Sequence, residues 1–255
     1  MKILTLRKYV VLGTLAAVLG GIHVASASDV ESTARVASHK FQSAGSTRIP
    51  VGSSTILFPA PAGYTDAAKD LPEVWRSLVS QPSPQVTGAY FLNLGTDTAS
   101  ELASRAFRAP YVIARFDKTM RTTTVTQRDF DQARLEFAST VHKLPTMMSS
   151  PQYKATLDRI VRGLGYDAGI LSTPVSLGVD ANQSDRFLFS QIATITMREG
   201  QDMSQRTMVR SFGAVYVRSK ILYVHVFRDY TGEESVLANK MFMLGLVDEL
   251  ILLNR

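Results

Sequence analysis

The sequence predicts an α+β fold, in which helices cover an antiparallel β-sheet on both faces and a C-terminal helix closes the domain. Three observations support this α/β/α sandwich. Strand-like runs of β-branched and aromatic residues come in two groups. A pair of helical patterns, over residues 126–162, separates the groups. The last strand-like runs are apolar on both faces, which is typical of strands covered on both sides.

The first 27 residues have the three parts of a cleavable secretory signal. The start is basic, with Lys2, Arg7 and Lys8. An apolar run without charge follows and ends in the small residues Ala25-Ser26-Ala27. We expect cleavage after Ala27, a location in the periplasm or outside the cell, and no stable membrane span afterwards. The alternative is an uncleaved anchor, although His23 and several glycines weaken the apolar run as a helix.

Composition limits the classes of partner and site. The formal net charge is +6, and the three basic residues of the signal account for half of it. The remainder is not the dense basic patch that nucleic acids require, so no nucleic-acid partner is expected. The chain has no cysteine. This excludes disulfides, thiolate metal sites, a cysteine nucleophile and a lipid-modified N-terminal cysteine.

Residues 28–48 are polar and rich in Ser and Ala, and we expect a flexible leader there. A single domain is expected over 49–255. Its first part has strand patterns at 55–58, 88–94 and 111–116, with a short helix over 70–80.

The helical pair at 126–162 is expected to be an insertion in this domain. Its first helix starts with a capping pattern, Thr126-Gln127-Arg128-Asp129. Its apolar face follows at helical spacing, with Phe130, Ala133, Phe137, Val141 and Leu144.

The last third is mostly strand, followed by one long helix. Strand patterns occupy 175–179, 187–197, 208–217 and 221–227, and the last two predict a hairpin. Thr231-Gly232-Glu233-Glu234 has the form of a capping box. The helix it starts should run to about Asn254.

A three-residue loop at 218–220 would pair Gly213 with His225 in this hairpin. His225 would then lie between Tyr223 and Phe227 on its own strand, with the space that Gly213 leaves beside its ring. One interpretation is a small binding site or a docking site for a partner. The other is a core histidine whose ring nitrogens are hydrogen-bonded by neighbours.

The same register would bring Arg210 and Arg228 close together. Like charges opposite each other are unfavourable unless an anion or an acidic partner lies between them. This predicts contact with an anion, with lipopolysaccharide or with an acidic protein, and the alternative is a solvated end of the sheet. The candidate binding residues are therefore His225, Tyr223, Phe227, Gly213, Arg210 and Arg228.

No catalytic or cofactor motif is recognisable. The sequence has no Gly-x-Ser-x-Gly elbow and no Gly-x-Gly-x-x-Gly loop. After the signal, the histidines are His39, His142 and His225, and His142, on a predicted helix, has no second histidine or acid at i±3 or i±4. We therefore expect no cofactor, no metal and no enzymatic activity.

Several stretches resemble secreted bacterial proteins with a PsbP-like α/β/α sandwich. They are the run Ile56-Leu57-Phe58-Pro59-Ala60-Pro61-Ala62-Gly63-Tyr64, the strand pair around 215–224, and the terminal helix that ends near Asn254. The resemblance covers about residues 49–255 and rests on apolar patterning with a Pro-Gly turn. It implies a non-enzymatic accessory or binding domain, and no functional residue of that family can be matched here.

Together these features predict an exported, non-catalytic binding or accessory protein of the bacterial cell envelope. Its partner would be an envelope protein or a small apolar or anionic ligand. Two alternatives stay open. One is a periplasmic hydrolase-like enzyme with an unrecognised site, and the other is a protein that docks on the envelope surface through a basic patch.

Overall fold

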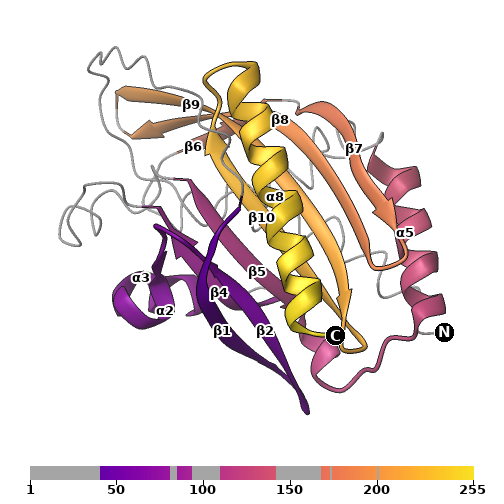
Figure 1. Ribbon diagram of the computed structural model, residues 1–255. Helices are drawn as coiled ribbons and strands as arrows, with labels where there is room; N and C mark the ends of the chain where they lie inside the picture. Colours follow the sequence, from indigo (N-terminus) through magenta and orange to yellow (C-terminus); the bar gives the residue numbers. More distant parts are fainter. Residues whose placement is uncertain (1–40, 81–84, 94–109, 142–167, 173, 200) are drawn as a thin grey trace.

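The computed structural model describes residues 41–80, 85–93, 110–141, 168–172, 174–199 and 201–255 (Figure 1). The predicted signal at 1–27 and the second predicted helix at 151–162 lie outside these residues. Within them, the prediction of an α+β fold is confirmed: an antiparallel sheet carries packed helices, and a helix ends the chain.

Most predicted elements are present, with longer strands than the patterns indicated. The strands are β1 (Ser43–Val51), β2 (Ser54–Pro61), β3 (Thr65–Asp66), β4 (Gln85–Leu92), β5 (Tyr111–Asp117), β6 (Ala168–Leu171), β7 (Val175–Gln183), β8 (Arg186–Glu199), β9 (Asp202–Val217) and β10 (Lys220–Asp229). The helices are α2 (Ala67–Asp70), α3 (Pro72–Ser80), the 3-10 helix η1 (Lys118–Arg121), α5 (Gln127–Val141) and α8 (Glu233–Leu253).

Among the described residues, one large sheet has the strand order β3-β4-β5-β10-β9-β8-β6. The strand β7 also pairs with β8, next to its first half, while β6 pairs with its second half. All pairings are antiparallel. The strands β1 and β2 form a separate hairpin. The central strands β5, β10 and β9 therefore have neighbours on both sides.

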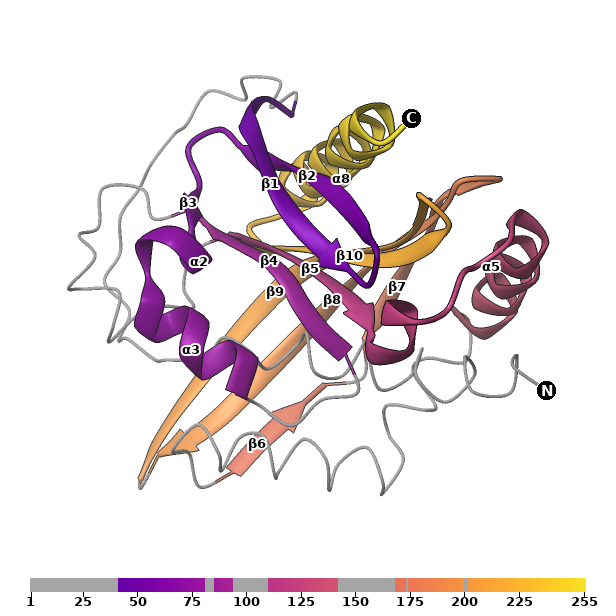
Figure 2. The same cartoon turned by 90° about the horizontal axis from the view of Figure 1, so that it is seen from below.

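Helices cover both faces of this sheet. Phe212 points to the face that we call the inner face, where its ring lies 6.4 Å from that of Phe137 on α5. The next residue, Gly213, points to the outer face, where an added Cβ would lie 2.6 Å from Met243 on α8. Because adjacent strand residues point to opposite faces, α5 and α8 lie on opposite sides of the sheet, as predicted (Figure 2).

A buried polar network holds α8 on the outer face. The Asn239 amide donates to Ser211 Oγ over 2.9 Å, and Ser211 shares a 2.7 Å hydrogen bond with Ser190. Ser190 in turn donates to Asp180 on β7, which forms a 2.8 Å ion pair with Lys240 of α8. These contacts fix the rotation of α8, which apolar packing alone specifies poorly.

The start of α8 differs from the prediction. The capping box at Thr231 is wrong, because Gly232 (φ 123°) is the N-cap and makes no side-chain cap bond. The Ser235 hydroxyl, in the first turn of α8, instead bonds the backbone just before the helix. It accepts from Thr231 N (3.0 Å) and donates to Gly232 O (2.6 Å). The predicted cap at Thr126 is confirmed, since Thr126 Oγ1 accepts from Asp129 N over 3.2 Å.

The fold begins before residue 49, so the predicted leader at 28–48 extends too far. The Phe41 ring packs edge-on against Phe242 of α8, with 5.4 Å between ring centroids. The strand β1 follows from Ser43 and pairs with β2 across a turn at Gly52. Most of β1 is exposed. Its polar composition therefore resembles a leader although backbone pairing makes it a strand.

The predicted register of the β9–β10 hairpin is wrong by one residue. The turn contains two residues, Arg218 (φ 48°) and Ser219 (φ 58°), so that Phe212 pairs with His225 and Arg210 with Phe227. Left-handed turns of this length usually contain Asn-Gly, which this sequence lacks. Tertiary contacts hold the strained residues: Val125 N donates to Ser219 O, and Arg218 donates to Asn254.

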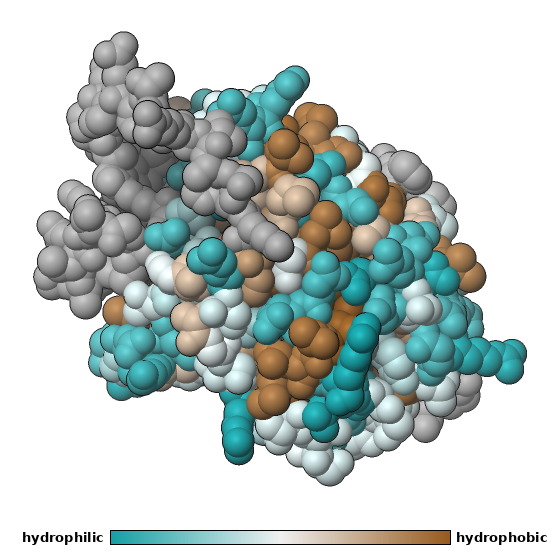
Figure 3. Space-filling view, viewed as in Figure 1, coloured by the Kyte–Doolittle hydropathy of each residue, from teal (hydrophilic) through white to brown (hydrophobic). Residues whose placement is uncertain are grey.

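Helix α8 is apolar beyond the face that packs on the sheet. Apolar side chains gather along it on the molecular surface (Figure 3). Three of them are more than half exposed: Leu237 (62%), Met241 (51%) and Leu252 (60%). No helix within the described residues is long and apolar enough to cross a membrane.

The close approach at Gly213 gives a test of the register. We predict that Gly213→Ala lowers the free energy of unfolding by roughly 1–3 kcal/mol, because the new methyl overlaps Met243 and Leu188. Urea unfolding measures this loss. In a Met243→Ala background the additional loss caused by Gly213→Ala should be smaller, since that background makes room for the methyl. If Gly213→Ala instead shifted the pKa of His225, this would support the register that pairs Gly213 with His225.

Candidate functional site

Polar side chains lie buried on the inner face of the sheet, and five of them are considered together. We call them the inner polar cluster: Tyr90 on β4, Arg115 on β5, Gln191 on β8, Arg210 on β9 and His225 on β10. Each is at most 3% exposed. Buried charged and amide groups are rare because leaving water is costly unless partners replace it. The cluster is therefore the feature of this sheet that packing alone does not explain.

Strand register places these residues on one face. Tyr223 of β10 pairs with Arg115, and His225 pairs with Ile113. On the other side of β5, Tyr90 pairs with the same Ile113. Arg115 thus lies one row away from both Tyr90 and His225, at the diagonal spacing that long side chains can bridge.

Arg210 determines the tautomer of His225. Its Nη2 lies 3.1 Å from His225 Nδ1. A guanidinium can only donate, so Nδ1 accepts and the neutral ring carries its proton on Nε2. Complete burial lowers the pKa of His225 well below its usual value, and the positive charges of Arg210 and Arg115 lower it further. His225 is therefore a neutral hydrogen-bond donor at Nε2.

Arg115 has no acidic partner among the described residues. Its Nε and Nη1 make no hydrogen bond within this part of the chain. Burial lowers the pKa of Arg115 to about 10, partly opposed by Tyr111 and Tyr90. Asp117 lies two residues further along the same face, but its Oδ1 accepts from Thr119 N (2.8 Å) and Thr119 Oγ1 (2.6 Å). A buried cation without a counter-charge is thus left beside Tyr90 and His225.

Other donors in the inner polar cluster also have no hydrogen-bond partner among the described residues. They are the Tyr90 hydroxyl, His225 Nε2 and Gln191 Nε2. Burial raises the pKa of the Tyr90 hydroxyl well above 10, so it keeps its proton. These donors without partners complement a group rich in acceptors. On the same face, Asp117 Oδ2 is a buried acceptor that also has no partner among the described residues.

The structure brings together four of the six predicted site residues. Tyr223, His225, Phe227 and Arg210 share the inner face, where the Arg210 guanidinium lies 5.6 Å from the centre of the Phe227 ring. Gly213 instead faces the outer side, so it makes no room for His225. The residue opposite His225 is Phe212, whose ring centroid lies 5.1 Å away.

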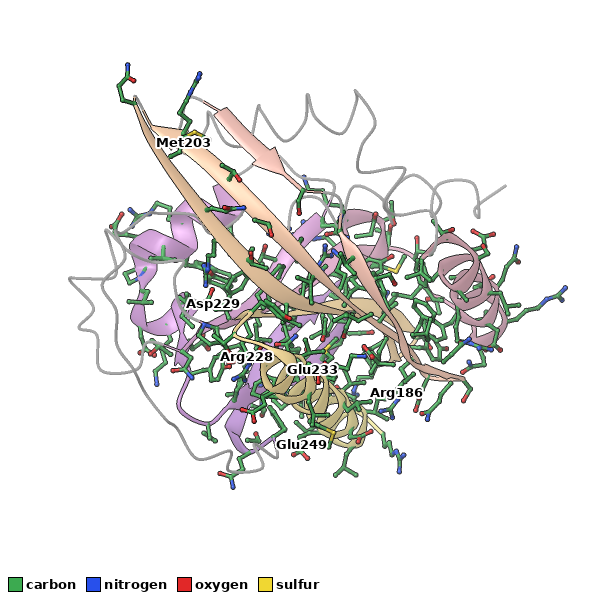
Figure 4. The ribbon with its side chains drawn as sticks, turned by 90° about the horizontal axis from the view of Figure 1, so that it is seen from above. Arg186, Met203, Arg228, Asp229, Glu233 and Glu249 are labelled. Atoms are coloured by element: carbon green, nitrogen blue, oxygen red, sulfur yellow. The ribbon has the colours of Figure 1, made fainter. Side chains whose placement is uncertain are left out.

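The predicted pairing of Arg210 with Arg228 is also wrong. Arg228 pairs with Val209 and lies on the outer face, whereas Arg210 is buried on the inner face. Arg228 and Asp229 lie where β10 ends, close to Glu233 at the start of α8 (Figure 4). Lys220, at the start of β10, is buried and donates to Met120 O and Thr123 O. These residues therefore form no common basic patch.

Sequence reasoning missed Tyr90, Arg115 and Gln191. A signal for Arg115 exists, because it is the one charge within the otherwise apolar run Tyr111-Val112-Ile113-Ala114-Arg115-Phe116. All of β5 is buried, so this side chain does not reach water. In the described part of the chain, no three His, Asp or Glu side chains come together as a metal site.

Comparison with known proteins identifies no family. No family model matches the chain, and no curated protein matches it. Among solved structures, it is similar to the Saccharomyces cerevisiae Ran-binding protein Mog1p, at 12% identity and a TM-score of 0.34, covering 82% of this chain and 93% of that one. A mutant of protein Mog1 gives 12% identity, a TM-score of 0.31 and coverages of 82% and 92%. The resemblance to PsbP-like proteins stays a prediction.

The unpaired charge of Arg115 gives a stability prediction. We expect Arg115→Met to raise the free energy of unfolding by about 1–3 kcal/mol in ligand-free protein, because an apolar side chain of similar length replaces an uncompensated buried charge. The exposed Arg76, which pairs with Glu73, is the matched control, and Arg76→Met should change stability by less than about 0.5 kcal/mol. A loss of stability in Arg115→Met would indicate a carboxylate partner such as Asp117.

The neutral state of His225 gives a pH prediction. The unfolded chain takes up a proton at this histidine near pH 6.5, whereas the folded protein does so only at a much lower pH. Acid therefore favours unfolding, by up to about 1.4 kcal/mol per pH unit below 6.5. Urea unfolding at several pH values between 6.5 and 5 measures how the free energy of unfolding changes with pH. This change per pH unit should be smaller in His225→Gln than in the parent protein. Equal changes would mean that His225 does not stay neutral.

Proposed function

We propose that this chain is an exported, non-catalytic binding protein of the bacterial cell envelope, and that it binds a small ligand at the inner polar cluster. One observation carries this proposal: Arg115 is 3% exposed and has no acidic partner among the described residues. A protein gains nothing in stability from such a charge. A ligand that supplies the missing counter-charge gives it a use.

Two further features support a binding role. The N-terminal pattern that ends at Ala27 resembles an export signal, which supports a location in the envelope or beyond it. His225 is held as a neutral donor by Arg210, and a fixed donor suits recognition of a ligand. General acid-base catalysis instead favours a histidine whose pKa lies near the working pH.

The test begins with the full chain expressed in a bacterial host. We expect the protein in the periplasmic fraction with Ser28 as its first residue. Native mass spectrometry of that material should detect a bound small molecule, which Arg115→Met loses and Arg76→Met retains. The Arg76 side chain is exposed, so its replacement controls for loss of one positive charge.

Three results would contradict the proposal. One is a protein that keeps Met1 and stays in the cytoplasm. The second is equal ligand content in the parent protein and Arg115→Met. The third is hydrolase activity on an esterase or peptidase panel that His225→Gln abolishes, since this would favour the enzyme alternative.

A further inference from the structure

The donors around Arg115 form a compact set on three adjacent strands. Arg115 of β5 contributes Nε and Nη1, Tyr90 of β4 its hydroxyl, and His225 of β10 its Nε2–H. Arg115 lies one row from both Tyr90 and His225 on the same face of the sheet. All three are at most 3% exposed. They surround Ile113, which is paired with both Tyr90 and His225.

We infer that this set binds the carboxylate of a small ligand whose remaining part is apolar. The inference rests on the proposed function, because it names the chemical class of the ligand at the same cluster. Arg115 would form the charged hydrogen bonds, while Tyr90 and His225 donate from either side. Charged hydrogen bonds of this kind are about twice as strong as neutral ones.

Charge balance favours a monoanion. His225 is neutral, and Arg115 is the charge of this set that has no acidic partner among the described residues. One carboxylate compensates that charge fully. A phosphate dianion would leave a net negative charge buried, which is costly in an apolar interior.

Hydrogen-bond balance agrees with the charge. A carboxylate accepts about four hydrogen bonds through its two oxygens. Four donor atoms are present: Nε and Nη1 of Arg115, the Tyr90 hydroxyl and His225 Nε2. A neutral amide would bring its own N–H donors against these donors, and this mismatch would leave polar groups unsatisfied.

The surroundings of the set favour an apolar body for the ligand. Ile113 lies between Tyr90 and His225, and the rings of Phe212 and Phe227 lie 5.1 and 6.2 Å from that of His225. These side chains offer no hydrogen-bond partner to a second polar group. An aliphatic or aromatic body therefore fits on this side of the set, while Gln191 Nε2, further along the inner polar cluster, is a donor for one more acceptor.

The test compares matched probes by isothermal titration calorimetry and thermal unfolding at constant ionic strength. The probes are propionate and benzoate, their neutral counterparts propionamide and benzamide, and inorganic phosphate. We expect binding and a raised Tm with the carboxylates only. Arg115→Met should weaken carboxylate binding by about tenfold or more, and Tyr90→Phe by a smaller factor. Arg76→Met should bind like the parent protein.

Several outcomes would overturn the inference. Amides or phosphate that bind as tightly as the carboxylates would refute the ligand class. Carboxylates that bind Arg115→Met as tightly as the parent would be adventitious additives only. If no carboxylate binds and Arg115→Met is simply more stable, water satisfies the donors instead. Native mass spectrometry that detects a ligand lost in Arg115→Met, while the carboxylate titrations fail, is a separate outcome. That combination would support the proposed function and refute this inference alone.

Discussion

The turn at Arg218 and Ser219 determines which side of the sheet each residue of β9 and β10 faces. Side chains alternate along a strand, so a loop one residue longer would exchange the two faces along one of these strands. The two-residue turn places His225, Phe227 and Arg210 together on the inner face and leaves Gly213 against α8. Both turn residues have positive φ, which costs about 1–2 kcal/mol for each L-residue.

Contacts from elsewhere in the fold offset the cost of this turn. Asn254 accepts from Arg218 and also bonds both backbone groups of Leu57, so one side chain joins the turn, β2 and the end of α8.

The two faces of the sheet treat buried polar groups differently. On the outer face, the chain Asn239–Ser211–Ser190–Asp180–Lys240 satisfies its hydroxyls and its charges in pairs, and it positions α8. On the inner face, Arg115 and the donors of Tyr90 and His225 have no partner among the described residues. Asn239 Oδ1 also has no partner among the described residues, so the outer network is not fully satisfied either. The difference is that the inner face leaves a charged group, Arg115, unpaired, and burying an unpaired charge costs more than burying an unpaired amide oxygen.

Periodicity predicted the elements of this fold well, because apolar alternation and helical spacing are local properties. The strand Tyr111–Phe116, the apolar face of α5 and the long final helix all follow from such patterns. The hairpin register did not follow, because its turn depends on two contacts that are distant along the chain. Val125 is 94 residues from Ser219, and Asn254 is 36 residues from Arg218. The early start of the domain was missed for a related reason, since Phe41 gains its role only from Phe242. The cluster was found in part, through His225 and Arg210. Arg115 was missed because its importance depends on pairing with β10 and β4.

The inner polar cluster lowers the stability of the fold, and apolar burial by α8 on the outer face offsets this loss. A buried unpaired arginine lowers the free energy of unfolding, a neutral buried histidine lowers it further below about pH 6.5, and the fold must offset that loss elsewhere. Helix α8 contributes large buried side chains along its length, among them Phe242, Leu246 and Leu250. Burial of one such side chain contributes about 1.5–3 kcal/mol. The outer face therefore supplies stability that is independent of the inner face. Separating the two roles on opposite sides of one sheet allows the inner face to keep donors that are poorly satisfied without a ligand.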